Sequence, residues 1–371
     1  MRVLMTCGGT GGHINPAIAI ANTIKNNIPD AEILFVGTKR GKEGELVPRE
    51  GYEIKFVESE GIRRSLSLSN IKAIYTALVS PYKAKPILRA FKPDVVIGTG
   101  GYACWPVLRA AAMMGIPCAV HESNAKAGMA VRRLEKHVDK ILINFDKTRE
   151  QLKYRDKAVT VGNPLRGAFS YMEKDAARAM LDIPKDTFFV LSYGGSGGAE
   201  FLNETMVKVM ALLADKHPKL LLQHAAGSRD FEPTRERFAA LGLKGKPNVR
   251  LEEYIFDMPA RMAAADLVIC RAGAMTVSEL AMMGKASILI PSPNVTDNHQ
   301  YMNAKVLADA GAACLLEEAK LTPELLAQNI EHYLAVRGER ERMELLVKSF
   351  ADPDANRRIF DEVMKLVKFK K

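Results

Sequence analysis

Short runs of apolar residues alternate with longer segments of mixed polarity along the whole chain. The runs are three to five residues long and rich in Val, Ile, Leu and Phe, as in strands that are buried on both faces of a sheet. The segments between them have lengths suited to the crossover helices that join parallel strands. We therefore predict an α/β protein with parallel sheets and with strands at residues 3–5, 33–36, 95–97, 118–120, 188–192, 220–223, 267–270 and 287–290.

One local pattern occurs twice. Residues 3–7 lead into Gly8-Gly9-Thr10-Gly11-Gly12, and residues 190–193 lead into Gly194-Gly195-Ser196-Gly197-Gly198. A strand, a glycine-rich turn and then a helix form the opening of a Rossmann-like domain. In a chain of 371 residues, the repeat predicts two Rossmann-like domains that face each other across a cleft, with a hinge at Gly162-Asn163-Pro164. The predicted extents are 1–163 for the N-terminal domain, 164–340 for the C-terminal domain, and 341–371 for a helical segment that packs back on the N-terminal domain.

The two glycine-rich turns are candidate phosphate sites. The backbone can approach a phosphate there, and the first N–H groups of the following helix have no partner inside that helix. Thr10 and Ser196 add hydroxyl donors at matching positions, although each turn could also serve only to pack its helix closely on the sheet. Ile14 and Glu200 stand where a dinucleotide fingerprint needs its third glycine, and neither turn has the Gly-Lys-Ser/Thr of a P-loop. A dehydrogenase and a P-loop ATPase are therefore disfavoured.

Polar side chains follow several predicted strands, at the edge where open α/β sheets bind ligands. His13 begins a predicted helix, where it could take a proton from a hydroxyl or simply bond to backbone. Glu279 lies near the first turn of another helix, where it could accept the hydroxyls of a ribose or only favour a positive helix end. Arg166, beside the predicted hinge, suits a pyrophosphate. The segments 121–124 and 297–300 are further polar loops.

The net charge of +10 indicates an anionic partner, and basic residues gather in one segment. Residues 61–93 contain seven Lys and Arg residues and no Asp or Glu. An apolar stripe between cations is typical of a helix at an anionic membrane surface, but also of an ordinary helix that covers a sheet. Nucleic acid is disfavoured, since the chain shows no nucleic-acid-binding motif and only 7% of its residues are aromatic. The apolar residues of the stripe, at steps of three and four, are Ile71, Ile74, Tyr75, Leu78, Val79 and Tyr82.

Three other features bear on the compartment and on cofactors. No apolar run is long enough to cross a bilayer, and Met1 leads straight into a strand pattern, so we expect a cytoplasmic protein. The five cysteines are far apart and form no Cys-X-X-Cys pair, so we interpret them as buried apolar residues. The Asp-X-Asp sequence at 352–354 lies in the terminal stretch, not at a predicted strand end. We therefore expect no metal ion and no other cofactor.

Taken in order, these motifs resemble the MurG family of glycosyltransferases, over nearly the whole chain. The resemblance implies the GT-B fold and an inverting transfer of N-acetylglucosamine (GlcNAc) from UDP-GlcNAc to the C4 hydroxyl of lipid I, the undecaprenyl-pyrophosphoryl-MurNAc-pentapeptide. The products would be UDP and lipid II, a precursor of peptidoglycan, made by a peripheral protein at the cytoplasmic face of the plasma membrane. The resemblance is carried by Gly8 to His13 with Pro16-Ala17, Gly100-Gly101-Tyr102 with Pro106, His121-Glu122 with Asn124, Gly162-Asn163-Pro164 with Arg166, Gly194-Gly195-Ser196, and Arg271 to Glu279 with Gln300.

The same resemblance implies roles for individual residues. His13 would be the favoured base, with Asn124 beside the reacting groups, and Glu279 would bind the ribose of the donor. Gln300 would bind the GlcNAc hydroxyls and Ile255 would lie against uracil. The remaining contacts to UDP-GlcNAc would come from Thr10, Gly11, Gly12, Arg166, Ser196, Ala274, Met275, Thr276, Val277 and Ser278.

The chain also departs from the family pattern. Gly197 and Ser123 stand where glutamine is frequent, as does His299, and Cys104-Trp105 is bulkier than the residues often found there. These departures concern the contacts to the donor. Three other functions remain open at this point: a transferase for another lipid such as diacylglycerol, a UDP-sugar 2-epimerase, and a nucleotide-binding protein without catalysis. The segment 61–93, free of acidic residues, favours a lipid-linked acceptor over the epimerase.

Overall fold

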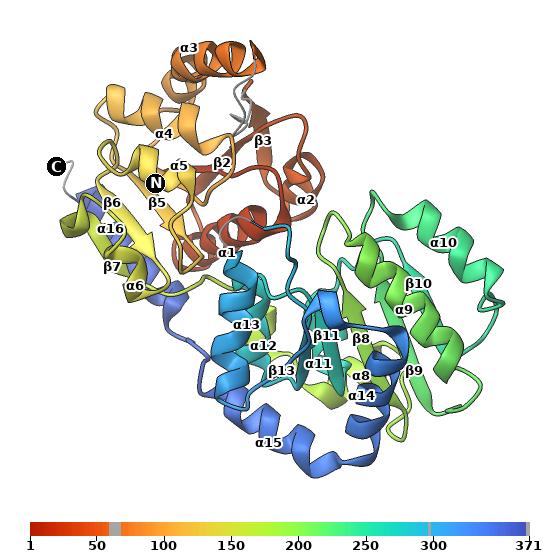
Figure 1. The fold of residues 1–371 in the computed structure, drawn as a ribbon. Coiled ribbons are helices and arrows are strands. Elements are labelled where there is room, and N and C mark those ends of the chain that lie inside the picture. The colour runs from red at the N-terminus through yellow and green to blue at the C-terminus, as the bar shows by residue number, and fades with distance from the viewer. Residues whose placement is uncertain (59–67, 296–297, 369–371) are drawn as a thin grey trace. The chain divides into compact units, whose positions relative to one another are not determined.

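The computed structural model of the chain describes residues 1–58, 68–295 and 298–368, and for residues 68–77 and 368 it describes the backbone only. The chain forms two compact units (Figure 1). The N-terminal unit consists of residues 1–166 together with the segment from Asp352 onward, and the C-terminal unit consists of residues 167–351. The chain thus passes between the units after Arg166 and again after Ala351, whereas the sequence had suggested boundaries after residues 163 and 340.

A parallel sheet of seven strands forms the centre of the N-terminal unit, in the order β3-β2-β1-β4-β5-β6-β7. The chain reverses its direction of travel across the sheet between β1 and β4, and this reversal is the topological switch point of a doubly wound fold. Helices α1 and α2 cover one face, and α3, α4 and α5 cover the other (Figure 1). The strands are β1 Arg2–Thr6, β2 Glu32–Gly37, β3 Glu53–Phe56, β4 Val95–Gly98, β5 Cys118–Glu122, β6 Lys140–Ile143 and β7 Ala158–Thr160.

The C-terminal unit repeats this plan with a parallel sheet of six strands, in the order β10-β9-β8-β11-β12-β13. Its switch point lies between β8 and β11. The prediction of an α/β protein with parallel sheets is therefore confirmed in both units. The strands are β8 Phe188–Tyr193, β9 Leu220–Ala225, β10 Val249–Glu252, β11 Leu267–Cys270, β12 Ser287–Leu289 and β13 Cys314–Leu315.

The helices fill the connections between these strands. In the N-terminal unit they are α1 Gly11–Asn27, α2 Glu43–Arg49, α3 Leu68–Phe91, α4 Cys104–Met113, α5 Met129–Leu134, α6 Asp146–Arg149 and α16 Ala355–Lys368, with a 3-10 turn at Arg155–Lys157. In the C-terminal unit they are α7 Ala168–Tyr171, α8 Lys174–Met180, α9 Glu200–Leu213, α10 Phe231–Ala240, α11 Met258–Ala264, α12 Ala274–Met283, α13 His299–Asp309, α14 Pro323–Ala335 and α15 Arg337–Lys348, with a 3-10 turn at Glu318–Lys320.

All eight strands expected from the apolar runs are present, as β1, β2, β4, β5, β8, β9, β11 and β12. The five strands that the runs did not indicate are β3, β6, β7, β10 and β13. They lie toward the outer parts of the sheets. Charged residues interrupt the apolar run in β3 and β10, and β7 and β13 are only three and two residues long. Strand β3, Glu-Ile-Lys-Phe, is the clearest case, because none of its four residues is buried.

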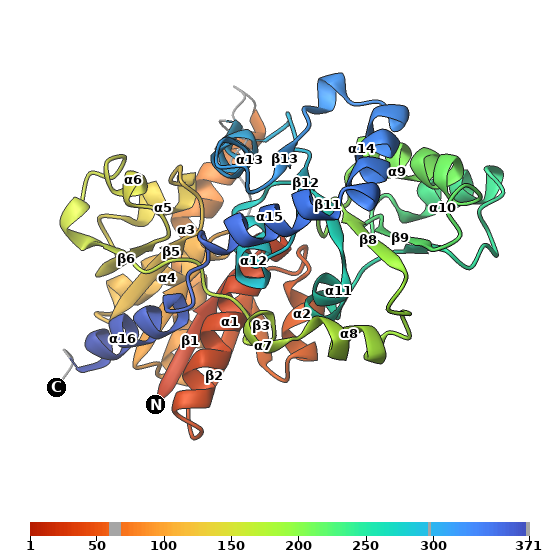
Figure 2. The ribbon, with the colours of Figure 1, turned by 90° about the horizontal axis from the view of Figure 1, so that it is seen from below.

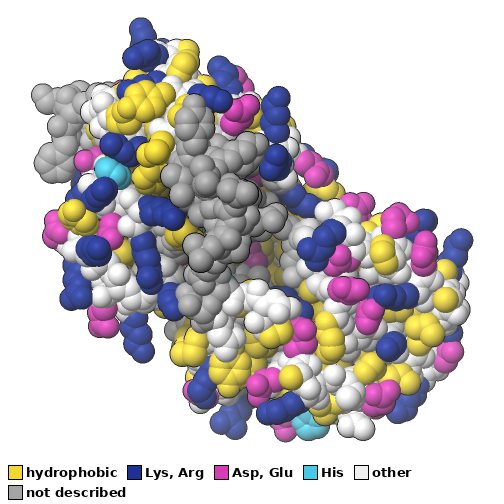
Figure 3. Space-filling model, turned by 45° about the horizontal axis from the view of Figure 1, so that its top comes forward, with side chains coloured by type: hydrophobic (Ala, Val, Ile, Leu, Met, Phe, Trp, Pro, Cys, Tyr) yellow, Lys and Arg dark blue, Asp and Glu magenta, His cyan; other side chains and the backbone are white. Residues whose placement is uncertain are grey.

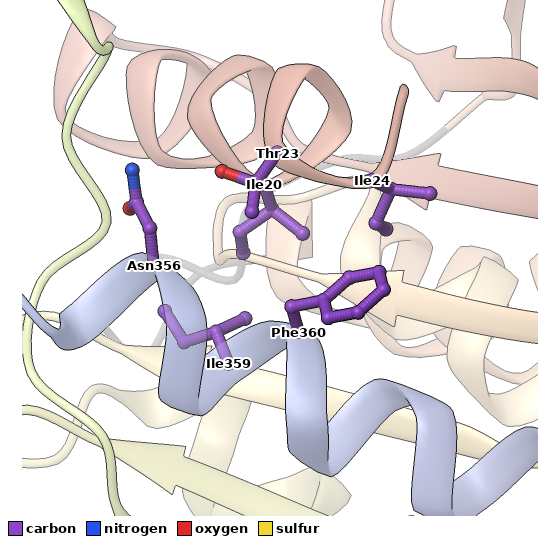
Figure 4. Close-up of a pocket in the computed structure, with 6 residues that line it drawn as sticks. All are labelled: Ile20, Thr23, Ile24, Asn356, Ile359 and Phe360. Atoms are coloured by element: carbon purple, nitrogen blue, oxygen red, sulfur yellow. The ribbon is translucent and has the colours of Figure 1, made fainter. Parts of the chain in front are cut away.

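The last helix returns to the N-terminal unit. Helix α16 runs along α1 (Figure 2), and Ile20, Ile24, Ile359 and Phe360 meet between them (Figure 4). Hydrogen bonds fix the start of α16, since the Asn356 side chain bonds both the N–H and the C=O of Leu165, at 3.1 and 2.7 Å. Helix α15, by contrast, packs on α12 within the C-terminal unit.

The basic segment forms helix α3, which contains Pro81 and Pro86. Ser80, Ala84 and Leu88 are buried, whereas Leu78 and Tyr82 are 66% and 60% exposed. Val79 of the predicted stripe is partly exposed, and the side chains of Ile71, Ile74 and Tyr75 lie outside the described part of the structure. Within the residues that the structure describes, every helix is too short or too polar to cross a bilayer.

Candidate active site

Two glycine-rich loops meet at the carboxyl end of the N-terminal sheet. Strand β1 ends at Thr6 and α1 begins at Gly11, while Gly100 and Gly101 follow β4, the neighbour of β1. Gly101 has a positive φ of 85°, and a side chain on it would overlap the carbonyl of Gly8. Only glycine allows this approach of the two loops.

His13 lies on this platform, in the first turn of α1. Its Nδ1 is 3.3 Å from the carbonyl oxygen of Gly8, an arrangement in which Nδ1–H donates and Nε2 keeps its lone pair. A Cβ on Gly100 would lie 2.5 Å from the ring, so the imidazole rests directly on that glycine. The hydroxyl of Thr99 donates to the His13 carbonyl oxygen at 2.6 Å, which ties α1 to the end of β4.

The surroundings of the ring favour its neutral form. Loss of water around the ring lowers the pKa of His13, and the negative charge of Glu122, the bond to Gly8 and the charge of Glu43 partly oppose that effect. A histidine that is neutral at physiological pH can accept a proton. His13 therefore lies at the start of α1 as predicted, and its role as a base stays a prediction.

Asn124 is oriented by an acidic neighbour. Oε1 of Glu122 accepts hydrogen bonds from the backbone N–H and the side-chain amide of Asn124, both at 3.0 Å, and Oε2 accepts from the N–H of Gly128 at 2.6 Å. His121, one residue earlier, is buried and bonds the carbonyl of Gly162 at 2.9 Å through Nε2. Burial lowers the pKa of His121 to about 4, so this histidine is a neutral structural donor.

Two residues near this platform were given no role at the site from the sequence. Glu43, at the start of α2, is fully buried and accepts a hydrogen bond from the N–H of Gly9 at 3.0 Å. The thiol of Cys104 lies 3.2 Å from the carbonyl of Thr6 and 3.0 Å from that of Gly100, so it joins the ends of β1 and β4. A signal for Glu43 was present, because an acidic residue follows the predicted strand 33–36 between two glycines, Gly41 and Gly44.

The C-terminal unit has a matching glycine-rich loop after β8. Gly195 and Gly198 have φ of 102° and 84°, and the N–H of Gly198 bonds the carbonyl of Gly195 at 3.0 Å. A side chain on Gly198 would overlap the carbonyl of Ala226, and one on Gly227 would overlap the backbone of Gly198. The loop that carries Ser196 therefore rests on the loop after β9, at the start of α9.

A network of hydrogen-bonded, buried polar side chains lies next to this loop and reaches the loop after β9. The hydroxyl of Ser192 lies 2.7 Å from Nδ1 of His224, and Nε2 of His224 lies 2.9 Å from Oδ1 of Asn203. The side-chain amide of Asn203 in turn donates to the carbonyl of Ala226 at 2.9 Å. Burial lowers the pKa of His224 to about 4, so the ring is neutral and bonds on both sides. The sequence pattern contained no sign of this network, since its members come from β8, β9 and α9.

Helix α12 begins at Ala274, directly after β11, and its first amides lie beside the strand that precedes the glycine-rich loop. Ala274 and Met275 are buried, while Thr276, Val277 and Ser278 are partly exposed. Glu279 is 7% exposed and is the sixth residue of α12, so it lies in the second turn, next to the first turn near which it was expected. At that depth the carboxylate gains little from the helix terminus, because the dipole effect falls off within the first turn.

The other predicted ligand residues lie in different surroundings. Arg166 belongs to the N-terminal unit and forms an ion pair with Glu50 at 3.3 Å. Ile255 is 4% exposed and packs in the core of the C-terminal unit. Gln300 is in the first turn of α13, where its side-chain oxygen accepts from the N–H of Ser292 at 2.9 Å. The structure thus gathers Thr10, Gly11, Gly12 and His13 at one sheet edge, and Ser196 and residues 274–279 at another.

The chain is similar to known glycosyltransferases. Residues 3–143 match the glycosyltransferase family 28 N-terminal domain, and residues 189–359 match the glycosyltransferase family 28 C-terminal domain. A protein of Acetivibrio thermocellus named UDP-N-acetylglucosamine--N-acetylmuramyl-(pentapeptide) pyrophosphoryl-undecaprenol N-acetylglucosamine transferase is 42% identical, over 100% of this chain and 99% of that protein. A protein of the same name from Alkaliphilus oremlandii is 40% identical over 100% of both chains.

Solved structures resemble this chain in fold. The crystal structure of Acinetobacter baumannii MurG has a TM-score of 0.69 and 29% sequence identity, over 98% of this chain and 99% of that chain. A UDP-GlcNAc 2-epimerase from Neisseria meningitidis has a TM-score of 0.68 at 17% identity, over 98% and 100%, and this likeness extends to the fold alone. From the two matched domains and the full-length relatives we conclude that the chain belongs to the MurG family, within glycosyltransferase family 28, and has its GT-B fold.

Proposed function

We propose that this glycosyltransferase moves GlcNAc from UDP-GlcNAc to the C4 hydroxyl of lipid I, with inversion at the anomeric carbon, to give lipid II for peptidoglycan synthesis. The observation that carries the proposal is His13, a neutral imidazole held over Gly100 by its bond to Gly8, with two buried glutamates near it. The names of the relatives at 40–42% identity support the two substrates.

In the proposed reaction, Nε2 of His13 accepts the proton of the C4 hydroxyl of lipid I. The oxygen attacks the anomeric carbon of GlcNAc as the bond from that carbon to the phosphate oxygen breaks, and UDP leaves with the electron pair. A single displacement inverts the configuration at the anomeric carbon. Asn124, fixed by Glu122, would hold a hydroxyl of one of the sugars near the reacting atoms.

The departing UDP is assigned to the C-terminal unit. The glycine-rich loop with Ser196 and the amino terminus of α12 offer N–H groups and helix dipoles that favour a phosphate. Glu279 would accept the ribose hydroxyls, and Gln300 would contact GlcNAc. Arg166 would have to exchange its ion pair with Glu50 for the pyrophosphate before it could contribute.

We propose that the transfer needs no metal ion. Glu43 and Glu122, the buried acids at the edge of the N-terminal sheet, already accept hydrogen bonds from backbone N–H groups. Asp352, in the Asp-X-Asp sequence, is paired with Arg358. Backbone dipoles would then stabilise the charge that develops on UDP.

We also propose that α3 binds an anionic membrane surface on the cytoplasmic side. Leu78 and Tyr82 expose apolar surface, and Lys85 lies over the Tyr82 ring at 4.8 Å. Figure 3 shows hydrophobic and basic side chains intermingled at the upper end of the N-terminal unit, where α3 lies. This pattern suits an element that lies in the headgroup region of a bilayer.

Release of UDP from UDP-GlcNAc, with and without a short-chain lipid I analogue and with EDTA in parallel, tests the proposal. We expect release that depends on the acceptor and survives EDTA, and we expect His13→Ala to slow it severely while UDP binding stays intact. Release without acceptor would favour an epimerase-like reaction. Normal turnover of His13→Ala would exclude His13 as the base.

A further inference from the structure

Glu43 is an acidic side chain buried without a cation. It opens α2 and is 0% exposed. Among the described residues it forms no ion pair, and its carboxylate instead accepts three hydrogen bonds. Oε1 accepts from the N–H and the hydroxyl of Thr38, both at 2.8 Å, and Oε2 accepts from the N–H of Gly9 at 3.0 Å. Burial of an anion costs free energy unless hydrogen bonds or an ion pair compensate for the lost water.

The backbone around Glu43 is shaped to the carboxylate. A side chain on Gly41 would overlap the carboxylate, and one on Gly37 would lie 2.5 Å from Cγ. A side chain on Gly8 would lie 3.1 Å from Oε1. Three glycines, Gly8 and Gly41 in the loops after β1 and β2 and Gly37 at the end of β2, thus lie so close to this carboxylate that a side chain on any of them would crowd or overlap it.

The contact reaches the proposed base through the backbone. Gly9 has a φ of 95° and lies between Gly8, whose carbonyl bonds the His13 ring, and Thr10, whose carbonyl accepts the N–H of His13 at 3.0 Å. The bond from Gly9 to Glu43 therefore fixes the loop that sets the position of the imidazole.

The charge of Glu43 acts on the same ring. The charged groups that influence His13 are both acidic, Glu122 from β5 and Glu43 from α2, and each favours the protonated imidazole. The thiols of Cys7 and Cys104, the other titratable groups around Glu43, are buried, and burial raises their pKa well above 9 so that they remain neutral. In a transfer that places a proton on His13, a nearby anion stabilises the charged product of that step.

We infer that Glu43 is a positioning residue of the transfer reaction: through Gly9 it holds the loop that orients His13, and its buried charge stabilises His13 when the ring takes up the acceptor's proton. The inference rests on the proposed role of His13 as base. It assigns Glu43 no contact with either substrate.

Glu43→Gln tests both parts of the inference. The amide keeps the size of the side chain, but if its oxygen faces Thr38 its NH2 group must face the N–H of Gly9. We expect kcat to fall by about tenfold to a hundredfold, as for a buried donor that loses its acceptor. Because a negative charge is lost, the pKa of His13 falls, so the acidic limb of the kcat/KM profile should move to lower pH. UDP affinity should stay unchanged.

Two further variants separate charge, tether and general stability. Thr38→Val keeps the charge and removes one bond to Oε1, so kcat should fall several-fold without a change in the acidic limb. Glu135→Gln is the matched control, since Glu135 is also a buried glutamate that accepts backbone N–H groups, from Lys153 at 2.7 Å and Tyr154 at 3.2 Å, but away from His13. It should leave kcat and the pH profile as in the unaltered protein.

An NMR titration of the histidine ring protons, with His13→Ala to assign the signal, measures the pKa of His13 without any turnover. A lower pKa in Glu43→Gln and an unchanged one in Glu135→Gln are expected. Equal pKa and equal kcat in Glu43→Gln and the unaltered protein would overturn the inference. If Glu43→Gln does not fold, an unchanged kcat in Thr38→Val would overturn it. Absence of acceptor-dependent UDP release in the unaltered protein would instead refute the proposed function, while the titration still decides for Glu43.

Discussion

His121 makes the stability of the N-terminal unit depend on pH. The ring is 1% exposed, and burial lowers its pKa to about 4, whereas a histidine in an unfolded chain titrates near 6.5. Between these two values the unfolded chain carries a proton that the folded chain does not. Stability from this group is therefore complete above pH 6.5 and is lost as the pH falls toward 4.

The magnitude follows from the two pKa values. At pH 4.5 the linkage relation gives a loss of roughly 2.5 kcal/mol relative to pH 7. The group is fully buried, so screening by solvent does not reduce this value greatly. Other titrating groups also destabilise the fold in acid, and the comparison with a variant that lacks only this ring removes their contribution.

The perturbation is His121→Gln, whose amide can still donate to the carbonyl of Gly162. Urea unfolding followed by tryptophan fluorescence reports the N-terminal unit alone, because Trp105 is the only tryptophan of the chain. We expect the variant to be the less stable protein at pH 7. Between pH 7 and pH 4.5 the unaltered protein should lose roughly 2.5 kcal/mol more unfolding free energy than the variant, so its stability advantage shrinks or reverses. A difference that is the same at both pH values would refute the claim that His121 is buried in its neutral form.

Three further predictions concern the site and the membrane. Glu279→Ala should weaken binding of UDP-GlcNAc about tenfold or more in calorimetry, because ribose hydroxyls lose a buried charged acceptor; unchanged affinity would contradict that role. Gly101→Ala should lower kcat more than tenfold with UDP affinity kept, whereas Gly115→Ala, with a positive φ but no neighbour within 4 Å, should cost stability only; equal activities would count against the loop contact. Replacing Leu78 and Tyr82 with Ser should reduce sedimentation with anionic vesicles, and unaltered binding by the folded variant would place the membrane surface elsewhere.

The sequence predicted those parts of the fold that depend on one segment at a time. Eight strands were visible because both faces of each are buried, and the glycine-rich turns were visible because a positive φ needs glycine. Strands β3 and β10 were missed because charged residues interrupt their apolar runs, and β7 and β13 because they are only three and two residues long. The short buried run of β6, Ile-Leu-Ile, was not recognised as a strand. Asn124 stood out as a polar residue shortly after a strand, and His13 as a polar residue at the start of the helix after the glycine-rich turn.

The sequence could not predict contacts between distant segments. Glu43 is 34 residues from Gly9, and the chain of Ser192, His224 and Asn203 joins two strands and a helix. Each member looks ordinary in its own segment, and its role depends on which strands become neighbours.

Both units begin with a strand, a glycine-rich loop and a helix, but the glycine that packs against this loop lies on opposite sides of the strand in the two units. This difference explains why we assign the nucleotide to the C-terminal unit. In the N-terminal unit the glycine that supports the first loop is Gly101, which follows β4, so the support and the His13 ring lie at the switch point between β1 and β4. In the C-terminal unit the supporting glycine is Gly227, which follows β9, on the side of β8 away from β11. The switch point between β8 and β11 is then bordered by a glycine-rich loop and the amino terminus of α12, both suited to phosphate. In the proposed reaction a side chain such as His13 at that point would compete with the pyrophosphate for space, whereas in the N-terminal unit it would serve as the base.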